Sequence, residues 1–253
     1  MEPHDPNHRL SEIETMWAKV QEAHGKPGSA AERVRNELLM RYYGAVHDYL
    51  LGMLHDATEA DELTQEFAVR FLRGDFCGAD PRRGRFRDFL KTAVRHLVID
   101  SWRQKKKEKD KGPKPLGKAA ADRAAVAELS DDDPIFIHAW RQALFAKAWR
   151  ALARLEEVTG QPYHTLLRAK SEHPELRSAQ LARQQSAQLG KEVSEAAVRQ
   201  TLHRARQRFA ELLLDEVAGS LPSADPKALE QELIELGLLD VCRHALRGRD
   251  QPA

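Results

Sequence analysis

The chain has few cysteines, no long apolar run and little sign of β-structure. Among its 253 residues are two cysteines, Cys77 and Cys242, which are too few and too far apart for a disulfide framework or a metal cluster. Residues 1–6 lack a basic or apolar run, so we expect no signal peptide. No apolar stretch is long enough to cross a bilayer. These absences predict a cytoplasmic protein without a metal, a cofactor or a membrane partner.

Sequence motifs that carry catalysis are missing as well. Eleven histidines are present, but none belongs to a His-Glu-x-x-His motif, and we find no Gly-rich phosphate loop and no nucleophile elbow. Scattered surface histidines explain these residues better than a catalytic site does. We therefore expect no enzyme activity.

Helical periodicity dominates what remains. Alternating apolar and polar residues are rare, whereas Ala, Leu, Arg, Gln and Glu are common. The pattern predicts helices at residues 30–54, 58–73, 86–106, 137–157, 161–170, 178–189 and 194–217, and a short helix at 11–24. A loop at 74–84 and a charged linker rich in Lys, Pro and Gly interrupt them. The fold class is therefore all-α, with two helical domains joined by a flexible charged linker.

The net charge of +1 conceals two basic segments and one acidic segment. Residues 82–118 hold fourteen Lys and Arg against four Asp and Glu, and residues 177–208 hold seven against two. Residues 211–240 hold eight acidic residues against one lysine. Basic stretches on helices are typical of contacts with nucleic acid.

Two neighbouring helices carry opposite charge. Asp61 and Gln65 share one side of the helix at 58–73, opposite its apolar face. Arg87, Lys91 and Arg95 follow one another at four-residue spacing on the helix at 86–106. We expect these three to form an exposed basic stripe.

The last two helices of the series form a helix–turn–helix candidate. Gly190 suits a helix C-terminus that needs a positive φ, and Ser194 is a good N-cap for the next helix. The second helix of such a motif places its N-terminal residues in the major groove, where Arg and Gln contact base edges. Arg199, Gln200, His203 and Arg206 lie off the apolar stripe of this second helix. A basic solvated face is common on helices, so this segment by itself leaves DNA binding open.

Together these segments resemble bacterial sigma factors of the extracytoplasmic-function (ECF) type, a branch of the sigma-70 family. The chain reads ADELTQEF at 60–67, GRFRDFL at 84–90, RHLVIDSWR at 95–103 and VRQTLHRAR at 198–206, and the family has similar motifs in this order. The resemblance covers roughly residues 32–102 (region 2) and 140–217 (region 4). It departs from the family at His96, where Asn is usual, at Phe89, where Trp is common, and in a turn at 190–194 that is about two residues longer.

The resemblance implies an organisation into five parts. These are a polar N-terminal extension at 1–28, sigma region 2 at 29–106, a linker at 107–134, sigma region 4 at 135–220 and an acidic helical extension at 221–253. Core RNA polymerase would bind Asp61, Gln65 and Glu66. The minus-ten element would meet Arg87, Lys91, Arg95, His96 and Arg103. The minus-thirty-five element would meet region 4 through Ser194, Glu195, Arg199, Gln200, His203 and Arg206. An anti-sigma factor remains open as a further partner.

Two alternatives remain, and so does a question about the acidic extension. The chain could be a stand-alone helix–turn–helix regulator that does not bind polymerase, or a degenerate sigma-like regulator.

In the acidic extension, leucines recur at helical spacing and predict a packed terminal helix, namely Leu229, Leu233, Leu236 and Leu239. A sharper hypothesis is that this helix covers the basic helix of region 4 and lowers its affinity for DNA.

Overall fold

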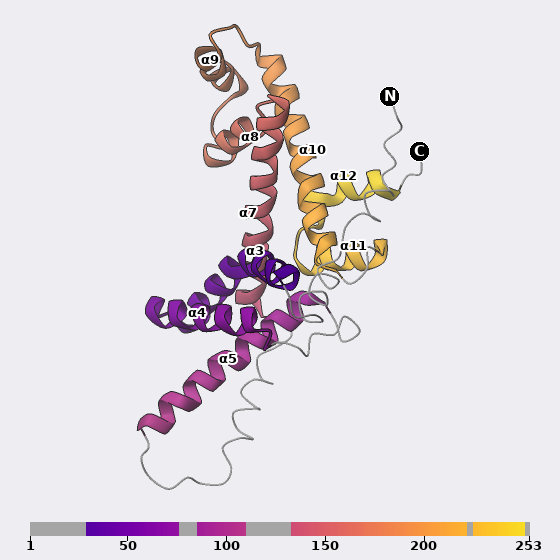
Figure 1. Ribbon diagram of the computed structural model, residues 1–253. Coiled ribbons are helices and arrows are strands. Elements are labelled where there is room, and N and C mark those ends of the chain that lie inside the picture. Colours follow the sequence, from indigo (N-terminus) through magenta and orange to yellow (C-terminus); the bar gives the residue numbers. More distant parts are fainter. Residues whose placement is uncertain (1–28, 76–84, 110–132, 222–224, 251–253) are drawn as a thin grey trace. The chain divides into compact units, whose positions relative to one another are not determined.

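The computed structural model describes residues 29–75, 85–109, 133–221 and 225–250, and Figure 1 shows their helices. The part of the chain so described contains helices and turns but no strand. In chain order the helices are α3 (Ser29–Leu54), α4 (Ala57–Arg73), α5 (Phe86–Lys109), α7 (Pro134–Thr159), α8 (Tyr163–Glu172), α9 (Ser178–Leu189), α10 (Glu195–Gly219), α11 (Pro226–Glu235) and α12 (Leu239–Asp250).

The predicted all-α fold is confirmed, and the helix bounds agree within a few residues from α3 to α10. The predicted helix at 11–24, most of the loop at 74–84 and most of the linker lie outside the described residues. The acidic extension forms two helices where one was expected. Gly237, with φ +62°, ends α11, and the Leu238 amide donates to the Leu233 carbonyl at 2.8 Å, as in a Schellman cap.

The described residues divide into two compact units, and the division falls within α7, after Ala143. One unit holds α3, α4, α5 and the first ten residues of α7. The other holds the rest of α7, α8, α9, most of α10, and the α11–α12 extension. The sequence placed the boundary before Ile135, so the first turns of α7 belong structurally to the unit that the sequence assigned to region 2.

Aromatic packing explains why α7 begins inside the first unit. The Trp140 ring stacks on Tyr42 of α3, with ring centroids 5.0 Å apart and an interplanar angle of 3°. Phe136 meets Tyr49 of α3 edge-on at 5.1 Å. Both α7 side chains are almost fully buried, so these turns contribute to the core of this unit.

The second unit is built around the far end of α7 and around α10. Phe209 of α10 stacks on Phe145 of α7 at 6.0 Å and packs against Trp149 at 4.6 Å. Glu156 of α7 accepts hydrogen bonds from the backbone amide and the hydroxyl of Thr165, at 2.9 and 2.5 Å. Because Pro162 provides no side-chain cap for α8, Glu156 satisfies an amide that the helix start would otherwise leave open.

The extension belongs to this second unit. Leu229, Leu233 and Leu236 are at most 2% exposed, so the extension packs as expected. The fourth buried leucine is Leu238 rather than the predicted Leu239, which is only partly buried, because the chain turns at Gly237. Polar contacts join α12 to α10: His244 lies 3.3 Å from Gln207, and Arg249 donates to Asp215.

Candidate nucleic-acid and polymerase interface

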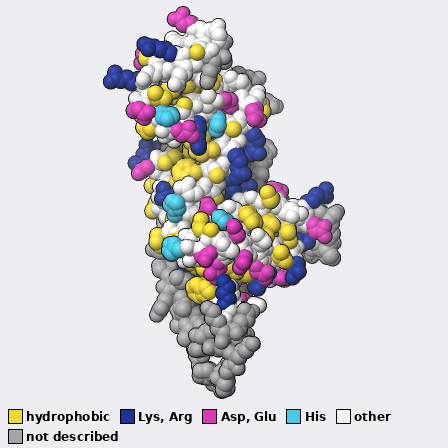
Figure 2. Space-filling model, turned by 90° about the vertical axis from the view of Figure 1, so that its left-hand side faces the viewer, with side chains coloured by type: hydrophobic (Ala, Val, Ile, Leu, Met, Phe, Trp, Pro, Cys, Tyr) yellow, Lys and Arg dark blue, Asp and Glu magenta, His cyan; other side chains and the backbone are white. Residues whose placement is uncertain are grey.

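Helix α4 presents a polar face that includes all three predicted polymerase-binding residues. Asp56 caps the helix by accepting from the Glu59 amide at 3.0 Å. Its apolar face, with Leu63, Phe67 and Phe71, is buried. Asp61, Gln65 and Glu66 are exposed, as is Glu62, which the sequence analysis did not single out. Figure 2 shows acidic side chains gathered on the face of the molecule that α4 helps to form.

Hydrogen bonds and ion pairs surround this acidic face. His47 of α3 lies 3.0 Å from the Asp61 carboxylate, and Glu66 pairs with Arg70 at 2.7 Å. Arg70 in turn lies 3.7 Å from Asp100 of α5. These pairs are well exposed, so each contributes at most about 1 kcal/mol to stability. A basic partner could therefore replace them at small cost.

Helix α5 does not display the basic stripe that the sequence predicts. Arg87, Lys91 and Arg95 are at most 6% exposed, so the expectation of an outer stripe is wrong. For two of them the covering groups are identified: the Lys91 amine lies 5.9 Å from the centre of the Phe136 ring, and Arg95 binds Asp133. Both covering residues come from the start of α7, which sequence periodicity could not place against α5.

The outer side of α5 carries different candidates. His96 is exposed and Arg103 is half-exposed. Seven residues separate them, so they lie on the same side of the helix, about two turns apart. Arg103 pairs loosely with Asp100 at 3.5 Å, and a phosphate could displace that exposed pair. Of the predicted region 2 DNA contacts, these two are accessible.

Tyr49, Arg95 and Asp133 form a buried hydrogen-bonded cluster. The Tyr49 hydroxyl donates to Asp133 at 2.6 Å, and Arg95 donates to the same carboxylate oxygen at 2.8 Å. Burial by itself would raise the pKa of Asp133, but hydrogen bonds from Tyr49 and Arg95 outweigh it and lower that pKa. Burial, with the hydrogen bond to Asp133, raises the pKa of Tyr49. The carboxylate is therefore held in its charged form.

The helix–turn–helix predicted from the sequence is present in the second unit. Gly190 ends α9 with φ +64°, and Ser194 caps α10 by accepting from the Ala197 amide at 3.1 Å. Ser186 of α9 accepts from the Val193 amide at 2.9 Å, which fixes the longer turn to the preceding helix. Leu166, Leu181, Ala182, Val198 and Leu202 form the core that joins α8, α9 and α10.

Every predicted region 4 contact is exposed, namely Ser194, Glu195, Arg199, Gln200, His203 and Arg206. Glu195 pairs with Arg199 at 2.5 Å, and each side chain is at least half exposed. Such a pair is worth at most about 1 kcal/mol. A bidentate contact of Arg with a guanine is worth roughly 1–3 kcal/mol of discrimination, so DNA could outcompete the internal pair.

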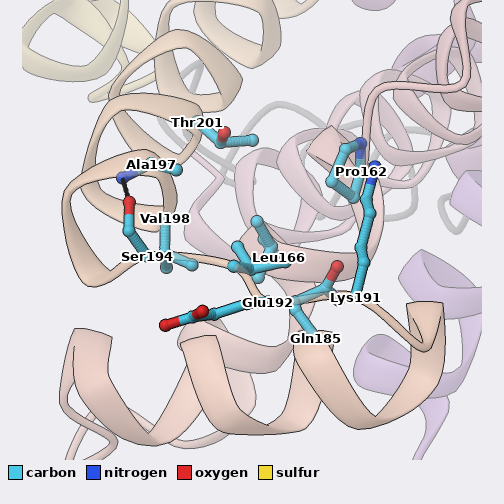
Figure 3. A pocket seen from close by; sticks show the side chains of 10 residues that line it. Pro162, Leu166, Gln185, Lys191, Glu192, Ser194, Ala197, Val198 and Thr201 are labelled. Atoms are coloured by element: carbon cyan, nitrogen blue, oxygen red, sulfur yellow. Dashed lines mark hydrogen bonds between the residues drawn. The ribbon is translucent and has the colours of Figure 1, made fainter.

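A hollow lies between α8, the turn and the start of α10. Figure 3 shows it, with Leu166 and Val198 near its centre and Gln185 reaching in from α9. Lys191 and Glu192 extend from the turn in different directions. Among all described residues, no group of His, Cys, Asp or Glu could hold a metal ion. None of the described helices is long and apolar enough to span a membrane.

The extension does not cover the predicted DNA-contacting residues. Those side chains remain exposed with α11 and α12 in place. The polar contacts of α12 with α10 include Gln207 and Asp215, which follow the predicted DNA-contacting residues along α10. The hypothesis that the extension masks region 4 therefore disagrees with the structure.

The described helices include an exposed helix–turn–helix, an arrangement that is typical of DNA-binding proteins, and one comparison adds to this. Residues 38–108 match the family model for Sigma-70 region 2. The match spans most of α3, all of α4 and nearly all of α5. It supports a sigma factor of the sigma-70 family, acting in promoter recognition and the initiation of transcription. Comparison with curated proteins and with solved structures gave no match.

Asp133 and Tyr49 are the residues that sequence reasoning missed. Nothing in the sequence analysis gives Tyr49 a polar role, and Asp133 falls within the expected linker at 107–134. A local pattern could have drawn attention to Asp133, because an Asp followed directly by Pro134 is a typical helix start. Nothing local identifies Arg95 as its partner.

Proposed function

We propose that this chain is an ECF-type sigma factor that directs core RNA polymerase to specific promoters in the bacterial cytoplasm. Core polymerase binds the exposed face of α4 through Asp61, Gln65 and Glu66. The observation that carries the proposal is the match to sigma-70 region 2 over residues 38–108. Within that segment α4 exposes an acidic face and α5 exposes His96 and, in part, Arg103. The chain has no catalytic activity of its own in this proposal.

DNA recognition is divided between two helices. His96 and Arg103 of α5 contact the minus-ten element. In region 4, α10 enters the major groove of the minus-thirty-five element with its N-terminal half. The exposure of both surfaces and the Ser194 cap support this assignment. The proposed contacts with the minus-ten element exclude Arg87, Lys91 and Arg95, because these side chains are buried.

Co-elution with bacterial core RNA polymerase on a sizing column tests the proposal. We expect the wild-type chain to co-elute and the double variant Asp61→Arg/Gln65→Ala to lose binding. The matched control is Glu230→Arg/Gln231→Ala, which makes the same charge change on exposed residues of α11 and should bind normally. A wild-type chain that binds duplex DNA but not polymerase would instead support a stand-alone helix–turn–helix regulator.

A further inference from the structure

A single carboxylate joins three helices of the first unit. Asp133 accepts from Tyr49 of α3 and from Arg95 of α5. Its other oxygen accepts from the backbone amides of Ile135 and Phe136, at 3.0 and 3.2 Å, which makes it the N-cap of α7. Arg95 also donates to the Tyr49 hydroxyl at 3.0 Å. The three side chains form a closed triangle of hydrogen bonds.

The triangle crosses the edge of the matched family segment. Tyr49 and Arg95 lie within residues 38–108, whereas Asp133 and α7 lie beyond them. The arginine that the family resemblance assigns to promoter DNA is thus neutralised by a carboxylate supplied from outside the family domain. Either the start of α7 is a lid that opens to release Arg95 for DNA, or it is a permanent anchor and Arg95 does not touch DNA.

Apolar burial decides between these two possibilities. Opening the lid would expose Phe136 and Trp140, which are 3% and 1% exposed. Burial of two such aromatic side chains favours the closed state on the order of a thousandfold. Gly52 of α3 adds to the fit, because a Cβ there would lie 2.6 Å from a methyl group of Ile135. One phosphate contact regained by Arg95 would not compensate for that loss.

We infer that Asp133 and Arg95 are positioning residues, which anchor the start of α7 to α5 and so hold the outer side of α5 toward the minus-ten element. This inference rests on the proposed function. Arg95 and His96 are consecutive residues, so if the helix turn at Arg95 changes its position, His96 rotates or shifts with it. Arg103 lies two turns further along the same helix and moves with it.

The test compares Arg95→Met and Asp133→Asn in the full chain bound to core polymerase. The probe is the promoter fragment that the wild-type complex selects from a random-sequence DNA pool. Asn keeps one carbonyl oxygen that can cap α7. Asp133→Asn therefore removes the charge and the oxygen that accepts from Tyr49 and Arg95. We expect both variants to bind the selected fragment several-fold more weakly, with little change toward a scrambled fragment and an unchanged dependence of affinity on salt.

Arg103→Met is the matched control, because it removes an arginine from the outer side of the same helix. Losing a phosphate contact lowers the slope of log affinity against log salt by about one, and we expect this for Arg103→Met but not for Arg95→Met. A slope lowered by about one in Arg95→Met would overturn the inference. So would tighter binding by Asp133→Asn, which frees the guanidinium, or wild-type binding by both variants.

Two further measurements keep the outcome clear. If Arg95→Met or Asp133→Asn fails to fold, Tyr49→Phe, which removes one hydroxyl from the triangle, decides by the same criteria. If the wild-type chain binds no polymerase and selects no fragment, the proposed function fails while the anchor remains testable. Thermal unfolding of both single variants and the double variant should then show non-additive effects, and additive effects would overturn the anchor.

Discussion

Replacing Trp140 by Ala tests whether the start of α7 belongs to the folded core of α3, α4 and α5. The side chain is 1% exposed, and its ring contacts Tyr42 at 5.0 Å, Phe136 at 5.9 Å and Phe86 at 6.4 Å. Truncating a fully buried tryptophan costs about 3–5 kcal/mol. For a domain of this size the melting temperature should fall by roughly 10–25 °C.

Differential scanning calorimetry of the full chain is the appropriate assay, because two compact units can unfold in separate transitions. One transition should move in Trp140→Ala and the other should stay in place. Trp102→Ala is the control, since Trp102 of α5 is 50% exposed and its loss should cost about 0.5 kcal/mol or less. If Trp140→Ala lowered the free energy of unfolding of the first unit by less than about 1 kcal/mol, the start of α7 would not contribute to the core of α3, α4 and α5.

Two smaller perturbations address the turn of the helix–turn–helix and the buried carboxylate. Ser186→Ala leaves the Val193 amide without its 2.9 Å partner and should destabilise the second unit by about 1 kcal/mol in urea, whereas the exposed Ser171→Ala should be neutral. Because the pKa of Asp133 is lowered in the fold from 3.8, its contribution to stability is present above that value and is lost as the pH falls through the folded pKa. When the pH is lowered below about 4, the melting temperature of Asp133→Asn should therefore fall less than that of the wild type. Melting temperatures that fall in parallel with pH would contradict this.

Helices and the helix–turn–helix were predictable because their determinants are local. The spacing of Leu38, Tyr42 and Val46 predicts a buried face, and all three are at most 3% exposed. Gly190 and Ser194 end and begin helices by their own backbone and side-chain chemistry. These features depend on residues within a few positions of one another, so periodicity and capping rules identify them.

The burial of the basic residues on α5 was not predictable in the same way. Arg87, Lys91 and Arg95 have the spacing of a solvated face, and an arginine is rarely buried unless paired. The partner of Arg95 lies 38 residues further along the chain, across a segment whose composition indicates a linker. Only the fold brings the two together, and charge patterning alone therefore predicts an exposed basic stripe on α5 where the fold buries these side chains.

Deleting residues 225–253 should weaken the second unit without strengthening DNA binding. Asp215 would lose its ion pair with Arg249, and the core would lose the buried leucines of α11. The melting temperature of the second unit should therefore fall. Gln207, which α12 contacts, lies twelve residues after Glu195, or about 18 Å along the helix at 1.5 Å per residue. That distance exceeds twice the Debye length of about 8 Å at 0.15 M salt. Charges on the extension are therefore largely screened from the first turn of α10, whereas Arg206 lies next to Gln207. Because Arg206 and the other predicted contacts remain exposed, we still expect no gain in duplex affinity, and an increase at this salt would show that the extension masks region 4 after all.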